Sequence, residues 1–288
     1  MSVHFAVALL LLTNMMMSVI TMPSIPDLSN PITSAQNSQI KLAKGLLTSN
    51  RQRNKHQQSI IEGTHLLSAA FKADHPIEQI LLAASQQHHP EVMQLLHTAW
   101  HKGIATTTVS DELYRSLSNL GTGIDIMAVI PIRQLSIRQI SGDCLILNDV
   151  QDAGNVGTLL RTAAAVGVTN VICTTGTAQV WSPKTLRAGM GAQFALMVYE
   201  NVLIADILAH VHTPMLATSS HTDAIIYKTD LQTPVAWVMG HEGQGVCDEL
   251  MQHATPIALP QPNGQESLNV AIAGALCLYE MLRQRQFA

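Results

Sequence analysis

The sequence has little charge and few aromatic side chains. Only 12% of its 288 residues are Asp, Glu, Lys or Arg, against ~25% in a typical globular protein. The formal net charge is −4, so the chain lacks the overall positive charge that draws many proteins to nucleic acid. Aromatic residues make up 4%, and Trp100, Trp181 and Trp237 are too scattered to form a base-stacking platform. We expect them in core or edge packing. An apolar content of 47% excludes a mainly disordered chain.

Cysteine is scarce, and its four positions are widely spaced: Cys144, Cys173, Cys247 and Cys277. They form no CxxC pair, which argues against a zinc ribbon and a disulfide scaffold and favours a reducing compartment. His97 and His101 lie four residues apart. Neither an H-E-x-x-H motif nor a carboxylate cluster accompanies them, so we expect surface histidines and no metal site.

The N-terminal residues 5–20 form a strongly apolar run. A signal peptide needs positive charge before such a run and a small-residue cleavage site after it, and both are missing. A membrane helix needs ~20 apolar residues, and Thr13, Asn14 and Ser18 interrupt this one. We favour a start of translation at Met22 or within residues 15–17, with a cleaved signal as the alternative. We expect a cytoplasmic protein with no stable membrane association.

Composition and periodicity divide the chain into four parts. Residues 1–40 form an apolar and then flexible lead-in, because residues 23–39 carry Pro, Ser, Asn and Gln with little apolar periodicity. Residues 41–132 form a small α/β domain, with helices over 63–71 and 91–101 and strands over 77–83, 107–109 and 124–129. Residues 133–142 are a polar linker. Residues 143–288 form a larger domain.

In the larger domain, short apolar runs alternate with helical patterns. We expect strands over 144–147, 168–173, 196–199, 215–218, 235–239 and 255–259, and helices over 156–166, 183–190, 202–212, 246–253 and 268–285. Such alternation predicts a mainly parallel sheet covered by helices on both faces.

A basic stretch opens the small domain. No Asp or Glu lies between Leu28 and Ile61, and five cations do: Lys41, Lys44, Arg51, Arg53 and Lys55. A charge run is usually a solvated helix face. On an acidic chain it can also contact the phosphate backbone of RNA, and we select these five as candidate RNA-binding residues.

Three loops at the carboxyl ends of predicted strands are rich in Gly, Asn, Ser and Glu, which is where open parallel sheets place their sites. They span residues 155–163, 239–245 and 259–270. Asn155 and Ser267 are candidate helix N-caps. The glycines at 240, 243 and 245 do not follow the GxGxxG spacing, so a dinucleotide fingerprint fails.

Taken in order, the three loops resemble the motifs of the SpoU class of RNA ribose 2′-O-methyltransferases in the SPOUT superfamily. The first, N-x-G-x-x-x-R-T-A, is matched by Asn155, Gly157 and Arg161-Thr162-Ala163. The second, G-x-E-G-x-G, is matched by Gly240, Glu242, Gly243 and Gly245. The third is matched by Ser267-Leu268-Asn269-Val270 and Leu278-Tyr279-Glu280. A segment from Ser182 to Ala188 also resembles the family, and the small domain more weakly resembles its ribosomal-protein-like substrate-binding domain.

The resemblance implies a C-terminal parallel α/β domain with a deep trefoil knot, a homodimer whose active sites combine both chains, and S-adenosylmethionine as cofactor. It implies methylation of a ribose 2′-hydroxyl, most simply in 23S ribosomal RNA. The implied catalytic residues are Arg161, Asn155, Glu242, Ser267 and Asn269. The implied cofactor-binding residues are Gly240, Gly243, Gly245, Leu259, Leu268 and Asn269.

The role of Arg161 has two interpretations. A guanidinium does not ordinarily release its proton in a protein, so action as a base needs a strongly perturbed environment or a phosphate relay. The alternative is that Arg161 orients the hydroxyl and stabilises charge near a phosphate.

The chain departs from the family pattern at three places and leaves rival functions open. Gln261 stands where the family often has Met, Gly189 where it often has Ser, and Ala271 where it often has Ser. The rivals are a tRNA 2′-O-methyltransferase, a non-catalytic RNA-binding or ribosome-assembly protein on the same fold, and an unrelated nucleotide-binding enzyme with an unknotted sheet.

Overall fold

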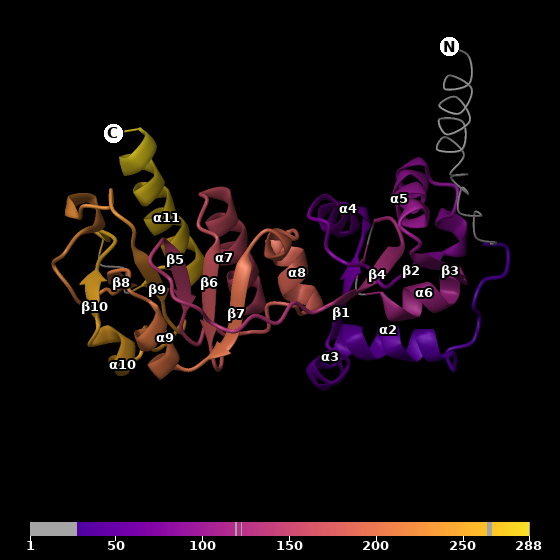
Figure 1. Ribbon diagram of the computed structural model, residues 1–288, viewed down its shortest axis with the longest axis horizontal. Coiled ribbons are helices and arrows are strands. Elements are labelled where there is room, and N and C mark those ends of the chain that lie inside the picture. Colours follow the sequence, from indigo (N-terminus) through magenta and orange to yellow (C-terminus); the bar gives the residue numbers. More distant parts are fainter. Residues whose placement is uncertain (1–27, 119, 122, 264–266, 288) are drawn as a thin grey trace, which may run out of the picture.

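The computed structural model describes residues 28–118, 120–121, 123–263 and 267–287. The apolar run at residues 5–20 lies outside them. Figure 1 shows two α/β domains lying next to each other along the long axis of the molecule, the N-terminal one in indigo to magenta and the C-terminal one from rose through orange to yellow. Within the described ranges, no helix is both long and apolar enough to cross a membrane.

The N-terminal domain is built on a four-stranded mixed sheet. Its order is β1 (Gln58–Glu62), β4 (Ile126–Pro131), β2 (Gln79–Ala83) and β3 (Ala105–Val109). Successive strand residues point to opposite faces, and both faces are covered. Ile61 and Leu82 pack with α4 (Thr64–Lys72) and α5 (Pro90–His101). Ile60 and Leu81 pack with α2 (Ser38–Thr48) and α6 (Asp111–Leu117) on the other face.

The C-terminal domain has a six-stranded sheet that is parallel throughout. Its order is β10 (Ala254–Ile257), β8 (Met215–Thr218), β9 (Ala236–Met239), β5 (Cys144–Leu147), β6 (Asn170–Thr174) and β7 (Met197–Val202). Helices α7 (Ala153–Ala165) and α11 (Val270–Gln286) cover one face. Helices α9 (Ile204–His210) and α10 (Asp248–Met251) cover the other. The expected α/β fold with a parallel sheet is confirmed, and strand β5 lies in the middle of it.

One hydrophobic core runs through both domains. Helix α8 (Pro183–Gly189) of the C-terminal domain packs against β1 of the N-terminal one. Arg187 of α8 donates to the carboxylate of Glu62 at 2.8 Å, and the Glu62 side chain is fully buried. The ring of His75 stacks on Trp181 with centroids 5.5 Å apart and lies 4.8 Å from that of Phe194. These contacts hold the two domains in one orientation.

Parts of the fold differ from the sequence-based prediction. Residues 28–40, expected as part of a flexible lead-in, are packed: Ile32 exchanges backbone hydrogen bonds with Thr108 and Ser110, and α2 begins at Ser38. Strand β1, helix α6 and the short helix α3 (Asn50–His56) were not predicted. The linker is extended, and Ile140 within it pairs with Val211 of the C-terminal domain.

Candidate functional site

The three motif loops meet through a network of hydrogen bonds around Glu242. Its carboxylate accepts from the side-chain amide of Asn155 at 3.0 Å and from the backbone N–H groups of Gln151 and Asp152, both at 3.2 Å. The Asn155 side chain in turn accepts from the Asn269 amide at 3.0 Å. Three motifs separated by up to 114 positions in the chain are therefore joined side chain to side chain.

Two helix N-termini hold this network in place, and their caps differ from the prediction. Asp152, not Asn155, caps α7, accepting from the N–H groups of Gly154 and Asn155. Asn269, not Ser267, caps α11 through the N–H groups of Ala271 and Ile272. Asn155 is thus inside the first turn of α7, which frees its amide to bind Glu242. The backbone donors of Gln151 and Asp152 were missed, although anion binding ahead of a helix is a known preference.

Glycine 157 in the first motif sets the position of α7. A Cβ at this residue would lie 2.7 Å from both the Gly189 nitrogen and the Thr185 oxygen, so only a glycine lets α7 and α8 approach this closely. Gly240 has the same function in the second loop, where a Cβ would meet the Gly245 carbonyl carbon at 2.1 Å. Gly157 therefore lets α7 pack closely against α8, and Gly240 shapes the loop that carries Glu242.

Both acidic residues of the network are held in their ionised form. Partial burial alone would raise the pKa of Glu242, but its hydrogen bonds from Asn155 and from backbone N–H groups lower it below the ordinary value. The hydrogen bond from Lys184, at 3.0 Å, and those from the α7 backbone lower the pKa of Asp152. At neutral pH, Glu242 is therefore an acceptor that can orient a donor such as a hydroxyl.

Arg161 and Ser267 do not join this network in the structure. Arg161 lies six positions after Asn155, which places the two side chains about 120° apart around an α-helix. Arg161 is exposed and, within the described residues, forms no hydrogen bond or ion pair. Ser267 is also exposed and has no hydrogen bond in the described part of the chain. A single copy of the chain therefore brings together three of the five proposed catalytic residues: Asn155, Glu242 and Asn269.

The residues expected to bind the cofactor are mainly glycines and leucines, which leave room for a ligand near the backbone and offer it apolar contacts. Gly240 is buried, Leu259 is partly buried, and Leu268 is 37% exposed ahead of α11. Gly243 and Gly245 are exposed, and Gly245 has a φ of 73°.

Gln261 gives an independent sign of a ligand at these loops. Its Oε1 is buried with no hydrogen-bond partner among the described residues, and a buried orphan acceptor is costly unless a ligand satisfies it. S-adenosylmethionine carries amino and hydroxyl donors, so the residues present fit it. The departure from the family pattern at position 261 was the available signal for this residue.

The basic stretch divides into an exposed part and a buried residue. Lys41, Lys44, Arg51 and Lys55 are exposed. Arg53 is only 7% exposed, and its guanidinium donates to the Leu46 carbonyl at 2.8 Å and to Gln179 of the other domain at 3.1 Å. Arg53 was also selected for RNA binding, but the structure places its side chain in the domain interface, away from the exposed cations. A charge pattern alone cannot reveal which member of a helix turns inward.

The described part of the chain contains neither a cluster of potential metal ligands nor a disulfide. No group of three or more His, Cys, Asp or Glu side chains gathers there as metal ligands would. The four cysteines are unpaired.

Comparison with known proteins identifies both domains. The SpoU rRNA Methylase family matches residues 143–279, and the MRM3-like substrate binding domain matches residues 37–128. A tRNA/rRNA methyltransferase of Synechocystis, itself uncharacterised, is 31% identical over 88% of this chain and 94% of its own. The 23S rRNA (guanosine(2553)-2′-O)-methyltransferase RlmP of Bacillus subtilis is 31% identical over 87% of this chain and 98% of its own.

Comparison with solved structures points to the same kind of protein. An AdoMet-bound rRNA methyltransferase from Sinorhizobium meliloti superposes with a TM-score of 0.78 at 25% identity, over 90% of this chain and 99% of that one. Two matched domains in the same order, nearly full-length relatives and the joined motif network lead to one conclusion. The chain belongs to the SpoU family of RNA methyltransferases.

Proposed function

We propose that this protein transfers a methyl group from S-adenosylmethionine to a ribose 2′-hydroxyl of 23S ribosomal RNA. The observation that carries the proposal is the Asn155–Glu242–Asn269 network, which joins the three family motifs in one place. Relatives named for 2′-O-methylation of 23S rRNA guanosine support the substrate. We place the reaction in the cytoplasm, where four unpaired cysteines are stable.

Each part of the site has a distinct task in this reaction. S-adenosylmethionine supplies a methyl group already activated by a positive sulfur, and Gly240, Leu259 and Leu268 with the neighbouring loop would hold it. The chain must then align the hydroxyl and ease the loss of its proton. The ionised Glu242 carboxylate accepts a hydrogen bond from the hydroxyl, while Asn155 and Asn269 keep that carboxylate in position.

Arg161 enters this site from a second copy of the chain. In support, α7 carries Arg161 on an exposed face and packs directly against α11. Helix α11 in turn exposes an apolar stripe at i, i+4 and i+7: Ile272, Leu276 and Tyr279, exposed by 55%, 43% and 53%. A stripe of this kind is suited to a self-complementary dimer contact. We also propose the trefoil knot of the family for the loops after β9 and β10.

The RNA is held by the N-terminal domain. Lys41, Lys44, Arg51 and Lys55 form its exposed cationic face and contact the phosphate backbone. The Glu62–Arg187 pair and the shared core join this domain to the one that carries Glu242.

The test is methyl transfer from labelled S-adenosylmethionine to unmodified 23S rRNA and, separately, to unmodified tRNA. The proposal predicts one labelled nucleotide in 23S rRNA. Label in tRNA alone would assign the tRNA alternative instead. Absence of both cofactor binding and transfer would favour a non-catalytic RNA-binding protein.

A further inference from the structure

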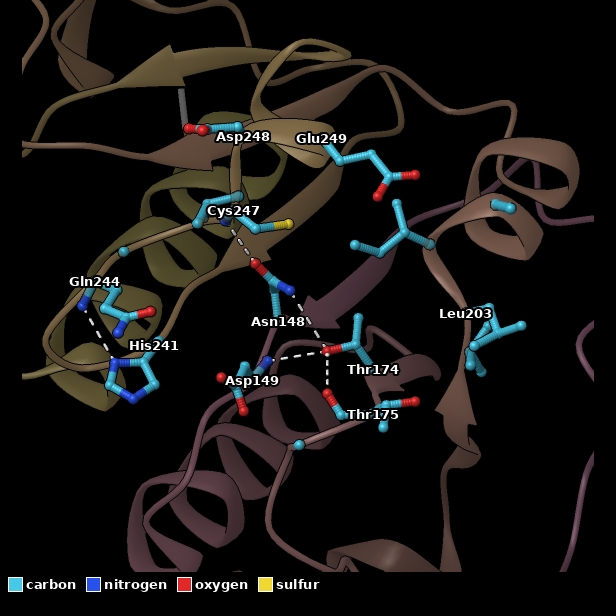
Figure 2. A pocket seen from close by; sticks show the side chains of 16 residues that line it. Asn148, Asp149, Thr174, Thr175, Leu203, His241, Gln244, Cys247, Asp248 and Glu249 are labelled. Atoms are coloured by element: carbon cyan, nitrogen blue, oxygen red, sulfur yellow. Dashed lines mark hydrogen bonds between the residues drawn. The ribbon is translucent and has the colours of Figure 1, made fainter.

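A cavity of about 860 Å³ opens at the carboxyl edge of the C-terminal sheet. Its lining includes the buried residues Asn148, Thr174, Val202 and Val246. Figure 2 shows Asp149 and His241 at one end of it, with the Asp149 carboxylate turned toward the His241 ring in this view. None of the residues assigned above to cofactor binding lines it except Gly245.

The cavity lies between the catalytic loop and the end of the sheet formed by β6 and β7. One wall follows the carboxyl ends of β5, β6 and β7, and the other is the loop after β9, which also carries Glu242.

The cavity is also directly connected to the catalytic network. Gln151 donates its backbone N–H to Glu242 and its side-chain amide to Asp149, at 3.2 and 3.3 Å. His241 precedes Glu242 in the chain and lines the cavity. Gln151 and His241 therefore connect the catalytic carboxylate directly to the wall of the cavity.

The chemistry of the lining excludes phosphate and favours a ligand rich in donors. Its charged side chains are all acidic, namely Asp149, Asp248 and Glu249, and it contains no Lys or Arg. The Nδ1 atom of His241 accepts hydrogen bonds from the backbone N–H groups of Gly243, at 2.9 Å, and Gln244, at 3.2 Å. When the ring is neutral, its proton is therefore on Nε2, which is left as a donor.

We propose that this cavity binds the base of the target nucleotide and selects guanine, an inference that rests on the proposed function. The Watson–Crick edge of guanine presents an acceptor, O6, followed by two donors, N1–H and N2–H. The His241 Nε2–H and the two carboxylate oxygens of Asp149 match that order. Both side chains line the cavity. Asp149 Oδ1 already accepts the Gln151 side-chain amide at 3.3 Å, and each carboxylate oxygen can accept a further hydrogen bond.

Other bases match this pattern less well. Adenine and cytosine place a donor where guanine has O6, and their ring nitrogen is an acceptor that would face the Asp149 carboxylate. Uracil offers only one donor. A base turned out of its stack into a pocket and read on its Watson–Crick edge is a common arrangement in enzymes that modify nucleotides.

Asp149→Asn tests the proposal, because asparagine tolerates the left-handed backbone of this residue, whose φ is 58°. With full-length protein and unmodified 23S rRNA transcript, we expect kcat/KM for RNA to fall about 10- to 100-fold while the Kd for S-adenosylmethionine stays unchanged. Asp206→Asn is the matched control. It removes the same charge from an exposed site on α9 outside the cavity, and its kcat/KM should equal that of the wild type.

A change in the RNA provides a second readout that does not depend on the folding of the variant. Once the modified guanosine is mapped, it is replaced by inosine, which lacks the N2 amino group. The kcat/KM of wild-type protein should be about 10-fold lower on the inosine RNA than on the guanosine RNA. The kcat/KM of Asp149→Asn should be the same on both RNAs. Equal methylation of guanosine by both proteins, or a modified nucleotide other than guanosine, would overturn the pocket assignment alone. No methylation of the transcript by wild-type protein would remove the proposed function and this assignment together.

Discussion

The side-chain amide of Asn155 donates to the carboxylate of Glu242 at 3.0 Å, although 87 positions separate the two residues. Neither residue has a compelling role when its motif is considered alone. Joined, and supported by Asn269, they form an oriented and ionised acceptor at the carboxyl edge of a parallel sheet. That edge is where such sheets place their active sites.

Glu242→Gln should lower kcat by about 100-fold, since the amide cannot serve as the charged acceptor for the hydroxyl. Asn155→Ala should lower it less, because two backbone N–H groups still hold Glu242. Single-turnover methyl transfer measures both. Glu91→Gln, in the first turn of α5 and far from the site, is the control. Wild-type rates in Glu242→Gln would show that the carboxylate has no part in the reaction.

Arg161→Ala should abolish transfer and leave the melting temperature unchanged, because Arg161 is exposed and its guanidinium has no partner within the described residues. Mixing it with inactive Glu242→Ala protein tests whether Arg161 acts across the dimer. In a two-fold symmetric dimer, random exchange should restore about a quarter of wild-type activity. If Arg161 acted within its own chain, each mixed dimer would contain two defective sites and no activity would return.

Gln261→Met should raise the stability of the cofactor-free protein and lower its affinity for S-adenosylmethionine. Removing a buried acceptor that has no partner among the described residues should raise the melting temperature of the cofactor-free protein. The loss of that acceptor should weaken the binding of S-adenosylmethionine about 10-fold in calorimetry. Tighter binding by Gln261→Met would show that Gln261 does not contact the cofactor.

Arg187→Ala should destabilise the protein by about 2 kcal/mol, because it removes the 2.8 Å charge-assisted hydrogen bond that Arg187 donates to the buried carboxylate of Glu62. Denaturant unfolding measures the change. Lys102→Ala breaks the exposed Lys102–Asp74 ion pair and should have no measurable effect. Equal stability of the two variants would mean that the domain interface does not depend on Arg187.

Glu280→Gln should show a pH-dependent loss of stability. The hydrogen bond from Arg283, together with one from Gln284, lowers the pKa of Glu280 to about 2. A carboxylate whose pKa is lower in the folded state stabilises the fold above its ordinary pKa and loses that effect as pH falls toward the folded value. The difference in melting temperature between Glu280→Gln and wild type should therefore be full at pH 7 and narrow steadily below about pH 4. A constant difference would contradict this role.

Much of the C-terminal sheet could be predicted from sequence. Short apolar runs buried on both faces are distinctive, and strands β5 and β8 begin and end where the pattern predicts. Strand β1 could not be predicted in this way. Its residues Gln58 and Glu62 are polar, and the strand depends on pairing with β4, almost 70 residues away in the chain.

The site was predicted in its residue types and only partly in its geometry. The motif pattern selects Asn155, Glu242 and Asn269, and the structure joins them. It does not reveal that Asp152 and Asn269 are the helix caps, since several neighbouring polar residues have equal capping propensity. Nor does it show that Arg53 turns inward to Gln179, because that contact depends on how the two domains pack.

The central claim is that the network around Glu242 directs methyl transfer to a ribose 2′-hydroxyl. The most direct test maps the methyl group that wild-type protein places on unmodified 23S rRNA and then repeats the reaction with a single 2′-deoxy substitution at that nucleotide. The account predicts one alkali-resistant phosphodiester bond at a guanosine, and no transfer to the deoxy substrate. A methyl group recovered on a base, or undiminished transfer to the deoxy substrate, would contradict it.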